Sequence, residues 1–168
     1  YLGHGVRNIT PGQSPRWMRR HLALCGLRSI SNVVDITNYV MLEIGQPMHA
    51  FDMSTLESTQ IIVRRARNDE SIVTLDGKEF QLSDSNLVIC DGSKPVALAG
   101  IMGGLNSEIT ENTTQLLFES AKFMRDNIRK TSRSLGQSTD SSSHYEKGIS
   151  EYTCELGMAR ALHLIQEL

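Results

Sequence analysis

The chain has 168 residues and a mass of 18.7 kDa, a length typical of one domain. Apolar residues make up 39% and charged residues 21%, which is ordinary for a globular protein. Its formal charge of -2 excludes a general positive field that would hold nucleic acid without selectivity. No apolar run approaches the roughly 18 residues of a membrane span.

The first element expected is a helix that begins at Ser14 and ends at Gly26. Ser14 is a good N-cap, and Pro15 suits the first helical position. Helical spacing predicts one apolar face, with three arginines on or near the other. The face consists of Trp17, Met18, His21, Leu22 and Cys25, and the arginines are Arg16, Arg19 and Arg20. A second helix is expected over residues 32–43, before Gly45 and Pro47.

The middle of the chain predicts β-strands. Asp76-Gly77 is a strong hairpin signal between residues 71–75 and 78–82. The other expected strands are 61–63, 87–90, 96–102 and 116–118. Two helices are expected after them, over residues 124–135 and 150–168, with a polar stretch at 137–143 between them. Strands grouped between helices, without βαβ alternation, predict the α+β class.

Familiar catalytic signatures are absent from the sequence. It has no Gly-x-Ser-x-Gly elbow, no His-Glu-x-x-His, no Walker loop and no Rossmann glycine pattern. The spacing of Cys25, Cys90 and Cys154 matches no standard zinc pattern, so we expect small buried residues in a reducing cytoplasm and no metal site. The start of the chain has neither an initiator Met nor a signal-peptide core, which predicts a piece of a longer protein.

Three segments remain unusual. Residues 33–40 place Asp, Thr and Asn in an apolar helix, either as a solvent-facing stripe or as groups that face a pocket. His49 lies between apolar neighbours, either as a satisfied core residue or as a group that holds a water or an ester. Gly103-Gly104 serves either a tight turn or a close approach to a ligand. Glu119 ends an apolar strand, either as a surface carboxylate or, if buried, as one that needs a hydrogen-bond partner such as a ligand hydroxyl.

Taken together, these segments resemble the editing domain of the bacterial phenylalanyl-tRNA synthetase beta subunit, its third and fourth modules combined. The resemblance rests on residues 29–52, 74–77, 97–104 and 119–121, which follow in the family order. It implies an α+β, three-layer fold with mixed or antiparallel sheets packed with helices. It also implies a single editing domain over residues 1–168, as a fragment of a longer cytoplasmic beta subunit.

The resemblance implies hydrolysis of tRNA(Phe) mischarged with tyrosine. Glu119 matches the residue that reads the tyrosine hydroxyl, and His49 matches the histidine beside the ester, which helps to position water. Thr37 and Asn38 match polar residues at that site. The pocket walls match Gly103, Thr139 and Ser141. No covalent intermediate is expected, because no Ser or Cys has a visible general base beside it.

The implied partners are the 3′ end of tRNA(Phe), the rest of the beta subunit and the alpha subunit, in a heterotetramer of two alpha and two beta subunits. The domain needs no cofactor, whereas the full synthetase uses ATP and Mg²⁺. Basic residues that recur at helical spacing in the later helix either contact phosphates or form a solvated face. These residues are Arg125, Arg129, Lys130 and Arg133.

Two departures from the family pattern leave alternatives open. Ser141 replaces a small residue that is often Ala, and the family's Arg-Phe/Tyr-Glu-Arg-Gly-Val-Asp reads His-Tyr-Glu-Lys-Gly-Ile-Ser at residues 144–150. A non-catalytic tRNA-docking or scaffold module of the same synthetase therefore remains an alternative. A freestanding deacylase acting in trans is another.

Overall fold

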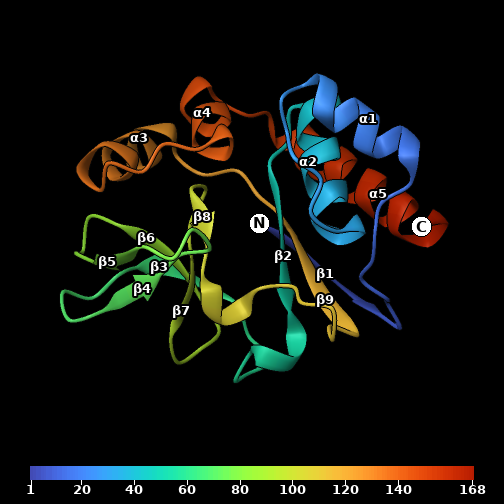
Figure 1. Cartoon of the computed structure of the whole chain (residues 1–168). Coiled ribbons are helices and arrows are strands. Elements are labelled where there is room, and N and C mark those ends of the chain that lie inside the picture. The colour runs from blue at the N-terminus through green and yellow to red at the C-terminus, as the bar shows by residue number, and fades with distance from the viewer. The chain divides into compact units, whose positions relative to one another are not determined.

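The computed structural model describes residues 1–168, and their contacts group them into two compact units. Unit 1 comprises Tyr1–Ser54, Ile109–Lys122 and Ile149–Leu168, and unit 2 comprises Thr55–Glu108 and Phe123–Gly148. Five α-helices and nine strands in three antiparallel sheets confirm the α+β class (Figure 1). None of the helices is both long enough and apolar enough to span a membrane.

Unit 1 is a three-stranded antiparallel sheet covered by helices. Its strands lie in the order β1-β9-β2, so that β9, the last strand in the sequence, is central. The strands are β1 (Leu2–Arg7), β2 (Met48–Asp52) and β9 (Gln115–Ser120). The helices are α1 (Arg16–Leu24), α2 (Asn32–Ile44) and α5 (Glu151–Glu167), and the short 3₁₀ turn η1 (Met53–Thr55) follows β2.

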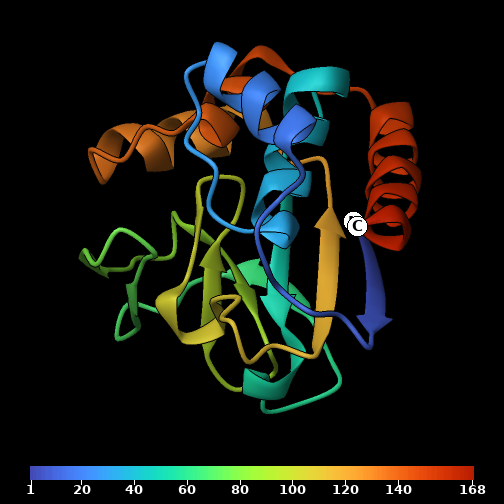
Figure 2. The same cartoon turned by 45° about the vertical axis from the view of Figure 1, so that its right-hand side comes forward.

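The core of unit 1 lies between one face of this sheet and its helices (Figure 2). Phe118 of β9 and Ala50 of β2 contribute from the sheet and are buried. The helical members of the cluster are Met18, Leu22, Val33, Ile36, Val40, Met158, Ala161 and Leu164. Because strand side chains alternate between faces, only every second strand residue belongs to this core.

Helix α2 has the ends that its sequence predicts. The Ser31 side chain accepts a hydrogen bond from the Val34 N–H at the N-terminus. Gly45 ends the helix with a φ of +80°, a left-handed conformation that glycine adopts without a steric penalty. The expected second helix is confirmed, and its end leads directly into β2.

The start of α1 differs from the prediction. Pro15, not Ser14, occupies the N-cap position, and the helix begins at Arg16. The Ser14 hydroxyl instead donates to Asp35 Oδ2 at 2.5 Å, which ties the entry to α1 onto α2. Asp35 is fully buried and also accepts from the Ile30 N–H at 2.8 Å. A buried carboxylate with several donors is a stronger partner for Ser14 than a helix end open to water.

Unit 2 contains a four-stranded sheet in the order β3-β6-β7-β8 and a separate hairpin, β4-β5. Its strands are β3 (Ile62–Arg65), β4 (Ser71–Val73), β5 (Glu79–Gln81), β6 (Leu87–Cys90), β7 (Pro95–Leu98) and β8 (Met102–Gly103). Its helices are α3 (Arg125–Ser134) and α4 (Asp140–Lys147), with a 3₁₀ turn η2 (Leu105–Ser107). The hairpin at Asp76-Gly77 is confirmed.

The expected single strand over residues 96–102 is wrong, because a turn divides it into β7 and β8. Gly100 has a φ of +69°, and the Ile101 N–H bonds back to the Leu98 carbonyl. A Cβ at Gly100 would also lie only 3.0 Å from Ile128 Cδ1 and Tyr145 Cδ2. Both the conformation and the close packing therefore require glycine here.

Candidate functional site

One row across the unit 1 sheet carries a carboxylate and an imidazole on neighbouring strands. Glu119 of β9 has two register partners, Gly3 on β1 and His49 on β2. Side chains in such directly opposed positions have Cβ atoms about 4.5–5.5 Å apart. The core residues Phe118 and Ala50 lie one position along and so occupy the other face. Glu119 and His49 therefore lie side by side on the face opposite the unit 1 core.

Glu119 is a buried carboxyl group, which excludes the surface alternative. The residue is only 5% exposed, and its Oε2 accepts a hydrogen bond of 2.8 Å from the Tyr1 hydroxyl. Burial raises the pKa of Glu119 to about 7, although the Tyr1 bond acts to lower it. The group is thus able to accept a hydrogen bond from a phenol, and its charge changes near neutral pH.

His49 is not the satisfied core histidine that one alternative described. Its Nε2 is buried and has no hydrogen-bond partner. The ring packs edge-on against Phe51, with 4.5 Å between the ring centroids. Burial lowers the pKa of His49 to about 4, so the imidazole is neutral at pH 7. A buried ring nitrogen without a partner is costly, and a bound water or ligand atom would satisfy it.

Thr37 and Asn38 lie on α2, the helix that precedes the strand of His49. Thr37 is buried, and its hydroxyl donates to the Val34 carbonyl at 2.7 Å, within its own helix. That hydrogen bond joins it to neither His49 nor Glu119. Since Thr37 and Asp35 are both buried, a solvent-facing stripe is not the explanation for them.

The other three predicted residues lie in unit 2 and cluster around the turn that divides β7 from β8. Gly103 is in β8, where it pairs with Ala97. The Thr139 hydroxyl donates to the Ile101 carbonyl at 2.9 Å. The Ser141 hydroxyl donates to the Gly100 carbonyl at 3.2 Å. The structure thus brings the start of α4 onto this turn through two side-chain hydroxyls.

The structure requires glycine at one of two neighbouring positions in unit 2, Gly103 and Gly104, and not demonstrably at the other. A Cβ at Gly104 would lie 2.7 Å from the Val96 carbonyl oxygen, so the backbone itself leaves no room for a side chain. Gly104 is therefore required by packing. Gly103 does not have a positive φ, so backbone conformation does not require glycine at this position.

Residues in and around the segments that depart from the family pattern have local structural roles. Thr139 caps α4 by accepting from the Ser142 N–H, and α4 replaces the expected polar stretch. Tyr145 is buried and packs against Phe123 with ring centroids 5.1 Å apart. Ser150 accepts from the Tyr152 N–H as the N-cap of α5. Serine and aspartate are both good N-caps, so the change at Ser150 preserves the start of α5.

Sequence reasoning missed Tyr1, the one donor bonded to Glu119. Tyr1 directly precedes β1, a strand that was not predicted because Gly3 and Gly5 interrupt its apolar residues. No local signal relates residue 1 to residue 119, because the contact depends on the pairing of β1 with β9.

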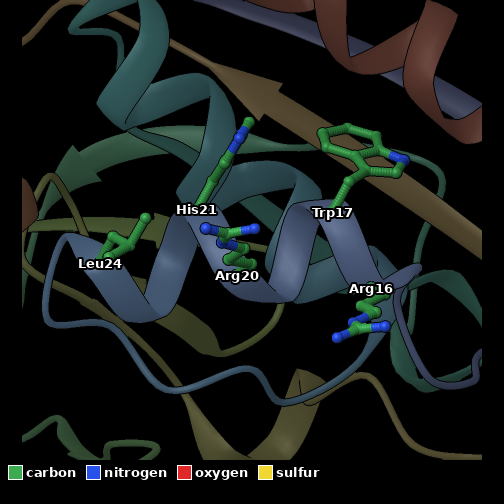
Figure 3. A pocket seen from close by; sticks show the side chains of 5 residues that line it. All are labelled: Arg16, Trp17, Arg20, His21 and Leu24. Atoms are coloured by element: carbon green, nitrogen blue, oxygen red, sulfur yellow. The ribbon is translucent and has the colours of Figure 1, made fainter.

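A surface cavity of about 600 Å³ lies along α1 and combines basic with aromatic side chains. It is lined by Arg16, Trp17, Arg20, His21 and Leu24 (Figure 3). The rings of Trp17 and His21 rise from the same side of the helix. Both meet Tyr39 of α2, with centroid distances of 5.4 Å from Trp17 and 6.1 Å from His21.

The predicted apolar face of α1 is therefore only partly correct. Met18 and Leu22 are fully buried, whereas Trp17 is 41% exposed and Cys25 is also exposed. Leu24 is 76% exposed, and the helix contains no acidic residue. The outer side of α1 is a basic surface with an accessible indole.

The cysteines and acidic residues show no cation site in the described chain. All three cysteines are free, and burial raises the pKa of the Cys90 and Cys154 thiols. No group of three or more His, Cys, Asp or Glu side chains is arranged to hold a metal ion.

A comparison with protein families identifies the kind of domain that the chain forms. A model of the B3/4 domain matches residues 1–168. The chain belongs to the B3/4 domain family.

The similar proteins include the phenylalanine–tRNA ligase beta subunit of Syntrophus aciditrophicus, which is 51% identical over 168 residues. The beta subunits of Clostridium acetobutylicum and Dehalococcoides mccartyi are 48% and 46% identical. Each match covers 100% of this chain and 21% of the relative, so the chain spans about a fifth of their length. An N-terminal fragment of the Pyrococcus horikoshii phenylalanyl-tRNA synthetase beta subunit matches 94% of this chain and 45% of its own, with 10% identity and a TM-score of 0.45.

Proposed function

We propose that this chain is the editing module of a phenylalanine–tRNA ligase beta subunit, and that it hydrolyses the ester of Tyr-tRNA(Phe). The observation that carries the proposal is the 2.8 Å hydrogen bond from a tyrosine hydroxyl to the buried carboxylate of Glu119. It shows that this carboxylate accepts from a phenol in its buried setting. The names of the similar proteins support the beta-subunit part of this assignment.

The selectivity follows from the cost of an unpaired polar group. Tyrosine differs from phenylalanine by one hydroxyl, and an apolar pocket rejects an added hydroxyl poorly. A site built to bond that hydroxyl discriminates far better, because the analogue without it leaves a buried group unpaired. Glu119 supplies such a group, and Tyr-tRNA(Phe) is the substrate that satisfies it.

Hydrolysis would proceed by direct attack of water on the aminoacyl ester. Neutral His49, with its unpartnered Nε2, is suited to accept a hydrogen bond from that water and hold it against the carbonyl carbon. We assign Thr37 and Asn38 to the same polar environment. On the resemblance, Gly103, Thr139 and Ser141 bind the amino acid. The hydroxyls of Thr139 and Ser141 donate to the carbonyls of residues 101 and 100, and these bonds keep the two side chains in place.

The remaining partners follow from the same proposal. The 3′ end of tRNA(Phe) would enter the site, and the alpha subunit and the rest of the beta subunit would complete a heterotetramer. ATP and Mg²⁺ would act at the aminoacylation site of the alpha subunit. The domain over residues 1–168 would act in cis as one module.

A paired deacylation assay tests the proposal. The complete ligase is incubated with Tyr-tRNA(Phe) and, separately, with Phe-tRNA(Phe), and loss of the ester is followed. We expect tyrosine to be released at least about 10²-fold faster, as for other sites that read a hydroxyl. Equal rates would contradict the proposal. Faster release of tyrosine by the 168-residue chain alone would show that the site is active and selective without the rest of the ligase.

A second candidate function, tRNA docking without catalysis, is favoured by the basic and aromatic cavity of α1. Arginine guanidinium groups bind phosphates, and an exposed indole offers a stacking surface for an unpaired base. Arg16, Arg20 and Trp17 lie together there on a helix without acidic residues. This candidate predicts tRNA binding that depends on α1.

The double variant Arg16→Ala/Arg20→Ala tests docking in the complete ligase. If both arginines contact phosphates, tRNA affinity falls and the slope of log affinity against log salt decreases by about 1.5. The matched control is Arg65→Ala/Arg67→Ala, which removes the same charge from two exposed residues that are not candidates for phosphate binding. Equal losses in both variants would indicate diffuse attraction and contradict docking at α1.

A further inference from the structure

We propose that Tyr1 is a positioning residue for substrate recognition: its hydroxyl holds Oε2 of Glu119 so that Oε1 is presented to the hydroxyl of the substrate tyrosine. The inference rests on the proposed function and adds a specificity residue to it. Tyr1 would not touch the reacting atoms and would act through Glu119.

The first observation is that the two carboxylate oxygens of Glu119 differ in their hydrogen bonds. Oε2 accepts from Tyr1 at 2.8 Å, and no protein donor bonds to Oε1. Oε1 is not one of the fully buried polar atoms without a partner, so this oxygen remains accessible. Glu119 therefore has one oxygen engaged by the protein and one left for a ligand.

The second observation is where the Tyr1 ring lies. Gly3 is the register partner of Glu119 on β1. The Tyr1 ring occupies this region, with Cε1 3.8 Å from the point where a Gly3 Cβ would lie. The ring thus reaches Glu119 from the neighbouring strand while β1 stays paired along its whole length.

The third observation concerns the charge state of the acceptor. The groups that face Glu119 from the neighbouring strands are the Tyr1 phenol on the β1 side and the neutral His49 imidazole on the β2 side. Burial raises the pKa of Glu119, and donation from Tyr1 opposes that rise. An ionised carboxylate is the stronger acceptor for a substrate phenol. Tyr1 would thereby keep more of Glu119 in the accepting form at neutral pH.

The test is Tyr1→Phe in the complete ligase, measured as the ratio of Tyr-tRNA(Phe) to Phe-tRNA(Phe) hydrolysis between about pH 6 and 9. We expect the ratio at pH 7 to fall about tenfold, the loss typical of one hydrogen bond to a charged group. We also expect the pH midpoint of the selectivity to move upward, because the carboxylate loses a donor. Phe-tRNA(Phe) hydrolysis should stay unchanged.

Two control variants separate positioning from structural damage. Tyr152→Phe makes the same chemical change on α5, where the residue is 80% exposed. This variant should leave both the ratio of the two hydrolysis rates and the pH midpoint of the selectivity unaltered. Gly3→Ala should also preserve the ratio, because its Cβ would meet Leu117 and Tyr1 only at ordinary contact distances. An unchanged or increased ratio in Tyr1→Phe would overturn the inference, and an increase would mean that the phenol blocks Glu119.

A readout independent of activity keeps this inference distinct from the proposed function. The protonation midpoint of Glu119 can be followed by its carboxyl stretch, in infrared difference spectra between each protein and its Glu119→Gln counterpart. Tyr1→Phe should raise this midpoint, and an unaltered midpoint would overturn the inference. If the proposed function itself fails, the unmodified ligase shows no preference for Tyr-tRNA(Phe), whatever the spectra show.

Discussion

Replacing Glu119 by alanine should abolish the preference for Tyr-tRNA(Phe), a loss on the order of 10²-fold or more in the ratio of the two hydrolysis rates. The variant removes the buried acceptor, so that the substrate hydroxyl would enter the site without a partner. Single-turnover deacylation of both aminoacyl-tRNAs measures the ratio. A preference for tyrosine that survives in Glu119→Ala would contradict the recognition role.

Glu119→Gln provides a matched control with a separate stability prediction. Because the folded pKa of about 7 lies above the ordinary value of 4.5, the folded chain retains a proton that the unfolded chain releases. The stabilising contribution of Glu119 is thus complete below about pH 4.5 and is lost as the pH rises through about 7. Glutamine keeps the shape without the charge, so the variant should be more stable by about 3 kcal/mol near pH 8.5.

Urea unfolding at two pH values checks this difference. Near pH 4.5 the stability advantage of Glu119→Gln should shrink to about 0.5 kcal/mol or less, because Glu119 is then protonated in the folded state. An equal advantage at both pH values would show that the effect does not arise from ionisation of Glu119. Selectivity should still fall in this variant, because an amide is a weaker acceptor for a phenol than a carboxylate.

Replacing His49 by alanine should slow hydrolysis of Tyr-tRNA(Phe) by about 10²- to 10⁴-fold, the range for a positioned acid–base or orienting group. The choice between tyrosine and phenylalanine should persist, because Glu119 remains. His4→Ala is the control, since His4 is exposed and pairs with Phe118 in the same sheet. An unaltered rate in His49→Ala would remove this residue from the mechanism.

The pH dependence should distinguish the two residues. Because burial lowers the pKa of His49 to about 4, its neutral form persists as the pH falls from 8 to about 5. The hydrolysis rate of Phe-tRNA(Phe), which does not depend on Glu119, should therefore stay nearly constant over that range, whereas the rate for Tyr-tRNA(Phe), and with it the tyrosine preference, declines as Glu119 becomes protonated below about pH 7. A Phe-tRNA(Phe) rate that falls with a midpoint near 6.5 would contradict the neutral state of His49.

Local signals in the sequence were sufficient for elements with clear ends. Helix α2 has Ser31 at its start and Gly45 at its end, and the β4–β5 hairpin has Asp76-Gly77 at its turn. Strand β1 was missed because glycines interrupt its apolar pattern. Helix α4 was missed because its serines favour caps and turns as readily as helix interiors. The place of α4 in the fold depends on contacts with residues distant in the sequence, such as those with the turn at residues 100–101.

The candidate site was predictable by residue type but not by geometry. The resemblance supplied His49 and Glu119, yet their position in one row depends on pairing between strands distant in the sequence. The burial of Glu119 could not be derived from its own neighbours, because it depends on β9 being the central strand. The bond from Tyr1 depends on the same long-range pairing, so no periodicity within a short window predicts it.

The central place of β9 also determines when this sheet forms during synthesis on the ribosome. Strands β1 and β2 leave the exit tunnel early, but they flank β9 and do not pair with each other. The whole of the Thr55–Glu108 segment must be synthesised before β9 emerges, and α5 completes the core later still. Such non-local pairing carries a loop-closure cost and slows folding. Until β9 arrives, β1 and β2 of the newly made chain lack their shared partner, and unpaired strand edges of this kind favour aggregation.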